Sequence, residues 1–273
     1  MSRPTPFHAL VTGATGGIGH GICRALIDQA GRDGRALTLT VTGSRAGEKL
    51  DALAAGLRAP GVTVHALGGD VTDPARCRSL VEDVVALGGD LSALVCVAGA
   101  SAPGKLAEMS VEQWDQCFHL NTRSVWLMAQ AARPSLLRTR GSITAIASMT
   151  GLQPIPGMGA YSPAKAALVM LCRQLAQEWG PDGIRTNTVC PGMIRTPLTE
   201  AVYQDDETRA RREALVPVGR IGTPADIGHA VAYLVSEGAS YVNGVDLLVD
   251  GGISGHMMAM IPGRPGKAAA PKS

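Results

Sequence analysis

The chain has 273 residues, enough for one large α/β domain or two small ones, and it carries a formal net charge of +2 with 18% charged residues. This balance provides neither a basic field for nucleic acid nor an acidic interaction tract. Because no eighteen apolar residues run together and MSRPTPFHALVTG lacks a secretory h-region, we expect a soluble cytoplasmic protein with no membrane partner.

Seven short apolar runs, bounded by glycine or aspartate, alternate along the chain with segments of helical spacing. The runs are HALVTG, LTLTVTG, VTVHALGGD, ALVCVAG, SITAIAS, IRTNTVCPG and VDLLVDGG. Such alternation is typical of βαβ units, in which a parallel sheet is covered by helices on both faces. We therefore predict a single doubly wound α/β domain over residues 1–253, a three-layer Rossmann fold.

The first apolar run ends at Thr12 and is followed by the glycine-rich turn TGATGGIG. Gly13, Gly17 and Gly19 lie where the backbone turns from a strand into a helix that begins near Ile18, and such a turn can hold a pyrophosphate. Glycine is common in any tight turn, and the spacing Gly-x-x-x-Gly-x-Gly differs from the standard dinucleotide fingerprint. Helical spacing predicts that this helix packs on the sheet through Ile18, Ile22, Ala25 and Leu26.

Proton transfer is indicated by a trio in the second half of the chain, Ser148, Tyr161 and Lys165. Because a helix repeats every 3.6 residues, the spacing of four puts the Tyr161 phenol and the Lys165 ammonium on one helical face. A phenol with a reference pKa of about 10 must shift by roughly 3 units to work near neutral pH, and a nearby cation supplies part of that shift. The alternative is an exposed Tyr and Lys that merely brush against each other.

Cysteine and histidine spacing argues against a disulfide framework and against a metal site. Without a C-x-x-C and with several members in apolar runs, the six cysteines are expected to be buried free thiols; they are Cys23, Cys77, Cys96, Cys117, Cys172 and Cys190. A nucleophilic Cys190 is an alternative, although no histidine partner is evident. We expect no metal, because the six histidines lack ligand spacing; they are His8, His20, His65, His119, His229 and His256.

The composition changes only after Gly252, where ISGHMMAMIPGRPGKAAAPKS is rich in Met, Pro, Gly and Lys. We predict a flexible C-terminal tail over residues 254–273. The alternative is a Met-rich patch that covers a neighbouring subunit.

Several segments occur together in a fixed order: TGATGGIG, Asp70-Val71, Ala98-Gly99, Asn121, Ser148, YSPAK from Tyr161 to Lys165, and Pro191-Gly192. With them, roughly residues 7 to 253 resemble the classical short-chain dehydrogenases/reductases, most closely the branch with 3-oxoacyl-acyl-carrier-protein reductase-like enzymes. The resemblance implies an oxidoreductase that transfers a hydride between NADP(H) or NAD(H) and a carbonyl or secondary alcohol.

By that resemblance the cofactor contacts fall at the ends of strands, where α/β sheets bind ligands. The phosphates would be held by Gly13, Thr15, Gly16, Gly17, Ile18 and Gly19. Asp70 and Val71 would line the adenine, and Ala98 and Gly99 would pass under the ribose. The nicotinamide carboxamide would meet Pro191, Gly192, Ile194 and Thr196.

Charge at the end of the second strand favours NADP over NAD. The segment TVTGSRAGEK has no acidic residue placed to take both ribose hydroxyls, whereas Ser44 and Arg45 can meet a 2′-phosphate. The alternative is that Arg45 caps a solvated turn. A second basic residue, often found in NADP users of the family where this chain has Gly16, is missing.

The resemblance also implies a role for each catalytic residue. Ser148 would hydrogen-bond the substrate oxygen, and Tyr161 would donate its proton in reduction or accept one in oxidation. Lys165 would hold the nicotinamide ribose and depress the pKa of Tyr161. Asn121 would anchor a water in a proton relay; the alternative is a helix-interior Asn that bonds its own backbone. Val97 departs from the usual Asn-Asn-Ala-Gly stretch, and we expect altered cofactor contacts there without loss of activity.

Substrate and assembly follow from the resemblance more loosely. Residues 193–217 correspond to a lid whose charges fit a solvated helix and whose apolar members could line the pocket: Met193, Leu198, Val202 and Tyr203. A carrier-bound substrate would require a basic docking surface, for which the candidates are Arg133, Arg138, Arg140 and Arg173. The family's tetramer would use helices at about 110–135 and 160–180 and the last strand, with support from Trp114, Trp126 and Trp179.

Two other functions stay open from the residues alone. A non-catalytic dinucleotide-binding regulator would keep the pocket but has no use for a proton relay. A lyase or epimerase on the same fold would show altered partners around Tyr161. The physiological substrate stays open between small ketones, sugars, steroids and polyketide intermediates.

Overall fold

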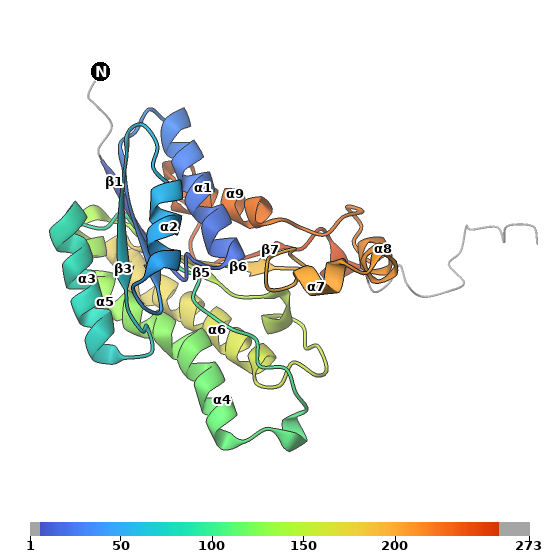
Figure 1. Ribbon diagram of the computed structural model, residues 1–273. Coiled ribbons are helices and arrows are strands. Elements are labelled where there is room, and N and C mark those ends of the chain that lie inside the picture. The colour runs from blue at the N-terminus through green and yellow to red at the C-terminus, as the bar shows by residue number, and fades with distance from the viewer. Residues whose placement is uncertain (1–5, 257–273) are drawn as a thin grey trace, which may run out of the picture.

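The computed structural model describes residues 6–256. Its centre is a parallel sheet of seven strands in the order β3-β2-β1-β4-β5-β6-β7 (Figure 1). The strands are β1 (Phe7–Thr12), β2 (Leu37–Gly43), β3 (Val62–Gly68), β4 (Ala93–Cys96), β5 (Ser142–Ile146), β6 (Arg185–Pro191) and β7 (Asp246–Val249). Every apolar run singled out in the sequence forms one of these strands, so the predicted doubly wound α/β fold is confirmed.

Helices cover both faces of this sheet (Figure 1). One face carries α1 (Gly17–Arg32), α2 (Glu48–Gly56) and α9 (Pro224–Val235), and the other carries α3 (Pro74–Gly88), α5 (Ser124–Thr139) and α6 (Tyr161–Trp179). Each face has its own buried apolar cluster, with Val11, Ile22 and Val231 in the first and Leu94, Ile143 and Leu168 in the second. The sheet is therefore buried from both sides, as its near-continuous apolar strands require.

The remaining segments are short, and most of them follow the carboxyl end of a strand. Before α5 come η1 (Leu106–Glu108), α4 (Val111–Phe118) and the π-helical turn η2 (His119–Arg123). After β5 and α6 come η3 (Met149–Gly151) and η4 (Gly180–Asp182). The segment after β6 contains α7 (Glu200–Tyr203) and α8 (Asp206–Ala214), which lie apart from the sheet in Figure 1, and the chain continues through η5 (Glu237–Ala239) and η6 (Ile253–Gly255).

Several helices start where local side chains satisfy the first free N–H groups. At α3 the Asp73 carboxylate accepts a hydrogen bond from the N–H of Ala75 (2.8 Å). At α4 Ser110 and Gln113 form a reciprocal capping box. Thr223 caps α9, and Pro224 takes the first helical position, where its missing N–H costs nothing.

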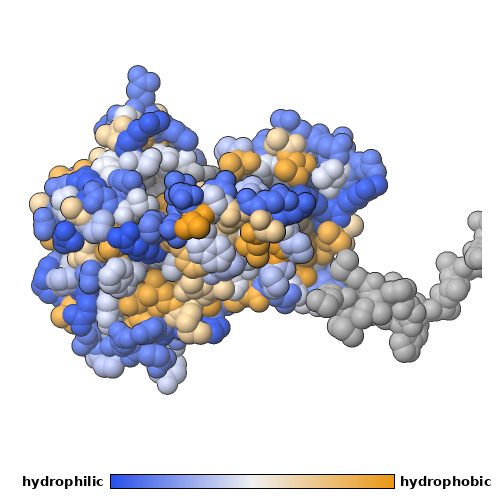
Figure 2. Space-filling model, turned by 90° about the horizontal axis from the view of Figure 1, so that it is seen from below, coloured by the Kyte–Doolittle hydropathy of each residue, from blue (hydrophilic) through white to orange (hydrophobic). Residues whose placement is uncertain are grey.

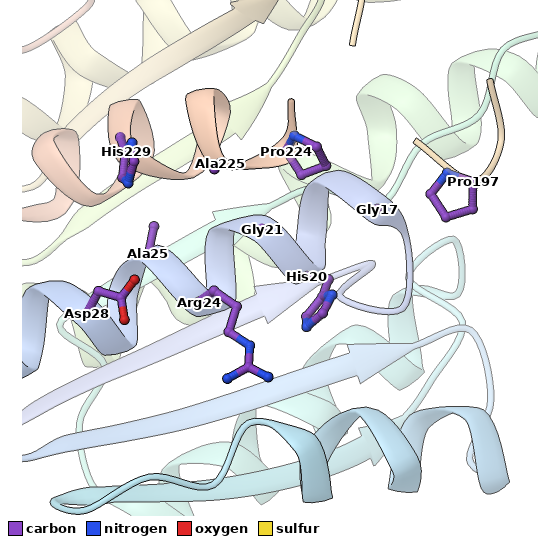
Figure 3. A pocket seen from close by; sticks show the side chains of 10 residues that line it. All are labelled: Gly17, His20, Gly21, Arg24, Ala25, Asp28, Pro197, Pro224, Ala225 and His229. Carbon is purple, nitrogen blue, oxygen red and sulfur yellow. The ribbon is translucent and has the colours of Figure 1, made fainter. Parts of the chain in front are cut away.

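Helices α1 and α9 pack closely because glycine occurs on both at their contact. A Cβ on Gly21 would lie 2.5 Å from Pro224, and a Cβ on Gly228 would lie 2.5 Å from the carbonyl oxygen of Gly21. Beside this contact a groove of about 340 Å³ opens between the helices (Figure 3). It is lined by Gly17, His20, Gly21, Arg24, Ala25, Asp28, Pro197, Pro224, Ala225 and His229.

The structure also bears on the predictions for the cysteines and for the C-terminal tail. All six cysteines are free and buried, as predicted. Between residues 6 and 256, no helix is both long and apolar enough to traverse a bilayer, and no three metal-ligating side chains gather. Of the predicted tail, residues 257–273 lie outside the described part of the chain, whereas Ser254 belongs to η6 and its N–H donates to Asp250 (2.9 Å).

Candidate active site

Ser148 lies just beyond the carboxyl end of β5, near the middle of the sheet. The strand itself ends at Ile146, two residues earlier than we predicted, because Ser148 turns the chain into η3. Its Oγ accepts hydrogen bonds from the N–H and the hydroxyl of Thr150, both at 3.1 Å. The hydroxyl of Ser148 therefore has a fixed position at the edge where strands present ligand-binding groups.

Tyr161 and Lys165 occupy the first turns of α6, as their spacing predicted. The Lys165 side chain is only 3% exposed, and its Nζ donates a hydrogen bond to the carbonyl oxygen of Ile146 at the end of β5 (2.8 Å). The same Nζ lies 5.6 Å from the centre of the Tyr161 ring. The ammonium is thus buried beside the phenol and directed toward the strand that leads to Ser148.

Burial dominates the titration of both groups. It lowers the pKa of the Lys165 ammonium to about 8. It also raises the pKa of the Tyr161 phenol, and hydrogen bonding with Ser148 opposes that rise only in part. We predicted that Lys165 depresses the pKa of Tyr161; the net shift of the phenol in the protein by itself is upward, because loss of solvent around the phenol outweighs the neighbouring groups.

Asn121 lies in the π-helical turn η2, and its side chain is buried. Its Nδ2 donates to the carbonyl oxygens of Ala100 and Cys117, both at 2.9 Å, and its Oδ1 accepts from the N–H of Ala100 (3.3 Å). The bond to Cys117, one helical turn back, is the backbone contact that we named as the alternative. Asn121 also reaches the catalytic residues, because a Cβ on Gly99 would lie 2.8 Å from its Oδ1 and 3.2 Å from Lys165 Nζ.

The glycine-rich turn lies at the carboxyl end of β1, where successive strands depart in opposite directions across the sheet. Gly13 adopts a φ of +64° and lies against the backbone of Ala98, which a Cβ would approach to 2.7 Å. Gly17 lies equally close to Thr196 and Pro197. Gly16 forms the N-cap of α1, so the turn presents backbone N–H groups at a helix N-terminus.

The other proposed cofactor residues surround the same edge of the sheet. Ser44 and Arg45 are exposed directly after β2, and across residues 6–256 no carboxylate pairs with Arg45. Asp70 is exposed and its carboxylate accepts from the N–H and the hydroxyl of Thr72 (2.8 and 2.7 Å), whereas Val71 is buried. The rest of the predicted set follows the same edge: Thr15 and Ile18 are half-buried, Pro191 ends β6, and Ile194 is buried after it.

At its start the predicted lid is joined to Gly222 by two backbone hydrogen bonds. The N–H of Arg195 donates to Gly222 (2.8 Å), and the N–H of Gly222 donates to Met193 (3.0 Å). Leu198 is 84% exposed, but Tyr203 is buried with Val216 and Ile221 in a small core of its own. The expectation that Tyr203 lines the pocket is therefore wrong, since its ring is used to hold the lid together.

Three of the four arginines considered for carrier docking are already paired. Arg133 binds Asp182 (2.5 Å), and Arg138 binds Asp90 (2.6 Å). The guanidinium of Arg173 donates to Asp246 through Nε (2.7 Å). These carboxylates neutralise most of the charge that an acidic carrier would meet on this set.

The groove between α1 and α9 is not lined by any of the four candidate catalytic side chains. Of the predicted site residues only Gly17 lines it. The nucleophilic alternative for Cys190 also loses support, because burial raises the pKa of its thiol to about 11 and keeps it protonated.

Three contributors to the site are not among the residues that the sequence predicted. The hydroxyl of Thr12 accepts from the N–H groups of Val97 and Ala98 (3.1 and 3.3 Å), which ties the ends of β1 and β4 together despite the absent Asn. Cys117 contacts Asn121, and Gly159 approaches the backbone of a second loop. In the sequence, only the glycine-containing run GMGA before Tyr161 indicated a close approach at Gly159.

Comparisons with known proteins match nearly the whole chain. The family model described as "Enoyl-(Acyl carrier protein) reductase" matches residues 13–254. The 3-oxoacyl-[acyl-carrier-protein] reductase FabG of Staphylococcus aureus is 33% identical over 246 residues, which is 90% of this chain and 97% of that protein. The 2-(S)-hydroxypropyl-CoM dehydrogenase 3 of Xanthobacter autotrophicus is 35% identical over 249 residues, covering 89% of this chain and 96% of the relative.

Solved structures give the same picture. The Pseudomonas aeruginosa RhlG/NADP active-site complex superimposes with a TM-score of 0.83 at 29% identity, covering 92% of this chain and 97% of that one. Since the family model spans most of the chain and relatives above 30% identity cover nearly all of it, the chain belongs to the short-chain dehydrogenase/reductase family of oxidoreductases.

Proposed function

We propose that this protein interconverts a ketone and a secondary alcohol with NADP(H), using Tyr161 as the general acid and base. One observation carries the proposal: Ser148, the pair Tyr161 and Lys165, and Asn121 come from three separate parts of the chain and gather at the carboxyl edge of the sheet. Random surface residues would not enclose a buried ammonium between a phenol and a strand carbonyl.

The residues present fit a dinucleotide. A Cβ at Gly13 or Gly17 would collide with Ala98 or with Thr196 and Pro197, so glycine is required for the close packing of this turn, and the turn ends in a helix N-terminus that suits a pyrophosphate. Gly99 leaves room beside Lys165, which would hold the ribose. When bound, the nicotinamide donates a hydride to the carbonyl carbon or accepts one from the alcohol carbon.

The chain itself handles the proton. In reduction the hydroxyls of Ser148 and Tyr161 donate hydrogen bonds to the substrate oxygen, and the phenol transfers its proton to that oxygen as negative charge develops there. In oxidation the phenolate takes the alcohol proton back. Lys165 favours the phenolate as a buried cation, and Asn121 links the lysine side of the site to the backbone of Ala100.

NADP is favoured over NAD by the groups after β2. Arg45 is exposed and has no carboxylate partner among the described residues, so it is available for a 2′-phosphate. We expect Arg45→Ala to raise the KM for NADPH about tenfold while leaving the KM for NADH within twofold. Equal changes for both cofactors would assign Arg45 to the turn alone.

We extend the proposal to the organisation of the protein. Residues up to about 253 act as one catalytic unit with 193–217 as its lid, and six free thiols suit the reducing cytoplasm. A homotetramer is supported by apolar side chains exposed on α4, α5 and α6, including Val111, Trp126 and Met170. Figure 2, which views the molecule from below, shows hydrophobic surface between hydrophilic residues.

The test is NADPH oxidation by the native protein against a panel of ketones, with Ser148→Ala as the matched variant. The panel includes small ketones, sugars, steroids, and a 3-oxoacyl group both as a free thioester and on a carrier protein. We expect turnover that falls at least about 100-fold in Ser148→Ala. Tight NADPH binding without any turnover would instead favour the alternative function, a non-catalytic dinucleotide-binding regulator.

A further inference from the structure

Two loops beside the candidate site are joined by their backbones. One precedes α4 and the other precedes α6. The N–H of Gly104 donates to the carbonyl oxygen of Gly157 (2.9 Å), and the N–H of Gly159 donates back to Gly104 (3.0 Å). These bonds make Gly104 and Met158 partners in a short parallel bridge. We call residues 102–109 and 157–159 together the strap.

The strap packs on a small buried cluster that touches two catalytic side chains. Cys117 of α4 and Ala160 and Ala164 of α6 form the cluster, and Ala102, Met109, Phe118 and Tyr161 pack against it. Cys117 also accepts a weak hydrogen bond from Asn121 Nδ2 at 3.5 Å. A displacement of the strap would therefore change the packing around both Tyr161 and Asn121.

Gly159 is the closest contact within the strap. It adopts a φ of +53°, and a Cβ there would lie 2.4 Å from the carbonyl oxygen of Ala102 and 2.3 Å from Met109 Cε. The methionine end can swing away, but the backbone oxygen cannot move without the whole loop. The contact leads directly into α6, because the N–H of Tyr161 bonds the carbonyl oxygen of Met158 (3.1 Å).

We infer that the strap sets the distance between the hydroxyls of Tyr161 and Ser148, and that Gly159 is a positioning residue for the reaction. The inference rests on the proposed function, since it concerns the placement of the proposed acid and base. It assigns a role to residues that touch neither cofactor nor substrate. The role is geometric, because a displacement of about 1 Å in a catalytic group can cost about 100-fold in rate.

The test compares Gly159→Ala with two glycines of similar backbone conformation that have open space around them. Gly34, in the loop after α1, has a φ of +60°, and Gly157, within the strap, has a φ of +83°. All three alanine variants bear left-handed strain, but only Gly159→Ala collides with a backbone. Gly34→Ala is expected to keep the native kcat, which isolates the collision.

For Gly159→Ala we expect kcat to fall about tenfold to 100-fold, with KM for NADPH unchanged. In the oxidation direction the limb of the pH profile that reports Tyr161 should move to higher pH, because the phenol loses the hydrogen bonding with Ser148 that opposes its raised pKa. Gly157→Ala should keep the native limb. If the Tyr161 limb lay at the same pH in Gly159→Ala and Gly157→Ala, the inference would be overturned.

Should Gly159→Ala fail to fold, Met109→Ala tests the same inference about the strap. It removes the side chain that fills the space between the strap and the cluster without forcing any backbone apart. We expect a smaller fall in kcat, about threefold to tenfold, with the same direction of limb shift; an unmoved limb contradicts the inference. Absence of turnover in the native protein would reject the proposed function itself, a separate outcome.

Discussion

The two sides of the candidate active site, the cofactor side and the lid side, are built in opposite ways. On the cofactor side, glycine backbones touch one another and Lys165 is almost completely buried. On the lid side, α8 carries exposed ion pairs within the helix itself, such as Arg211 with Glu207, and Leu198 is 84% exposed. Such pairs contribute about 0 to 1 kcal/mol each and do not fasten α8 to the sheet, so the tip of the lid is weakly held where the cofactor side is tightly packed. Rigid packing is thus placed where proton transfer needs fixed geometry.

The exception on the lid side is its base. Arg220 donates two hydrogen bonds to Asp226 (2.8 and 2.7 Å), and Asp226 also accepts from the N–H of Thr223 (2.7 Å). The guanidinium of Arg220 holds the pKa of Asp226 far below its usual range. The contrast in packing and hydrogen bonding therefore lies between the tip of the lid, formed by α8, and the two regions below it, the base of the lid and the cofactor side.

The largest expected effect comes from the buried side, at Lys165. Lys165→Met should lower kcat about 1000-fold, because the cation beside the phenol is lost. Stability should hold or increase, since an apolar chain replaces a buried charge. Steady-state kinetics and thermal melting measure both. A residual rate within tenfold of the native one would remove Lys165 from the mechanism.

The same residue predicts a pH dependence of stability. Folded Lys165 releases its proton near pH 8, whereas an unfolded lysine does so near 10.5, so the unfolded state holds more protons between these values. The free energy of unfolding of the native protein, relative to Lys165→Met, should rise by about 3 kcal/mol from pH 8 to 10.5. Urea titrations at several pH values measure it, and a difference that stays constant would mean that Lys165 remains charged.

The next effect concerns the glycine turn. A Cβ on Gly19 would lie 2.5 Å from the carbonyl oxygen of Gly13, whereas a Cβ on Gly16 would lie 3.4 Å from the same atom. We expect Gly19→Ala to destabilise the protein by about 2 kcal/mol and Gly16→Ala by less than about 0.5 kcal/mol. Urea midpoints compare them directly. Similar losses in both variants would mean that the turn relaxes freely.

The smallest effects should be found on the lid and at its base. Arg220→Ala is expected to cost about 1 kcal/mol, because Asp226 loses two hydrogen bonds at the start of α9. Arg211→Ala should cost less than about 0.5 kcal/mol, since its pair with Glu207 is solvated. Thermal melting of both variants measures the difference. An equal loss would erase the distinction between the base and the tip.

The fold was predictable because its signals are local and repeated. Seven apolar runs predicted seven strands, and the spacing of Tyr161 and Lys165 placed both on α6. The resemblance then added Asn121, which the structure brings to the same edge as Ser148. These predictions needed only the strand and helix periods together with the order of motifs.

What the sequence did not predict depends on contacts between distant segments. The raised pKa of Tyr161 follows from burial, which a spacing of four residues does not encode. Tyr203 is buried by Val216 and Ile221, which lie beyond the helices of the lid. The strap joins loops more than fifty residues apart through backbone bonds, and backbone bonds leave no pattern in side chains.

The most direct test of the central claim is the rate of hydride transfer in Tyr161→Phe under single-turnover conditions with saturating NADPH. This substitution removes one hydroxyl and keeps the ring that packs on Cys117 and Ala160. We predict a rate about 1000-fold below the native one with unchanged NADPH affinity. A phenylalanine variant that transfers hydride within threefold of the native rate would contradict the account.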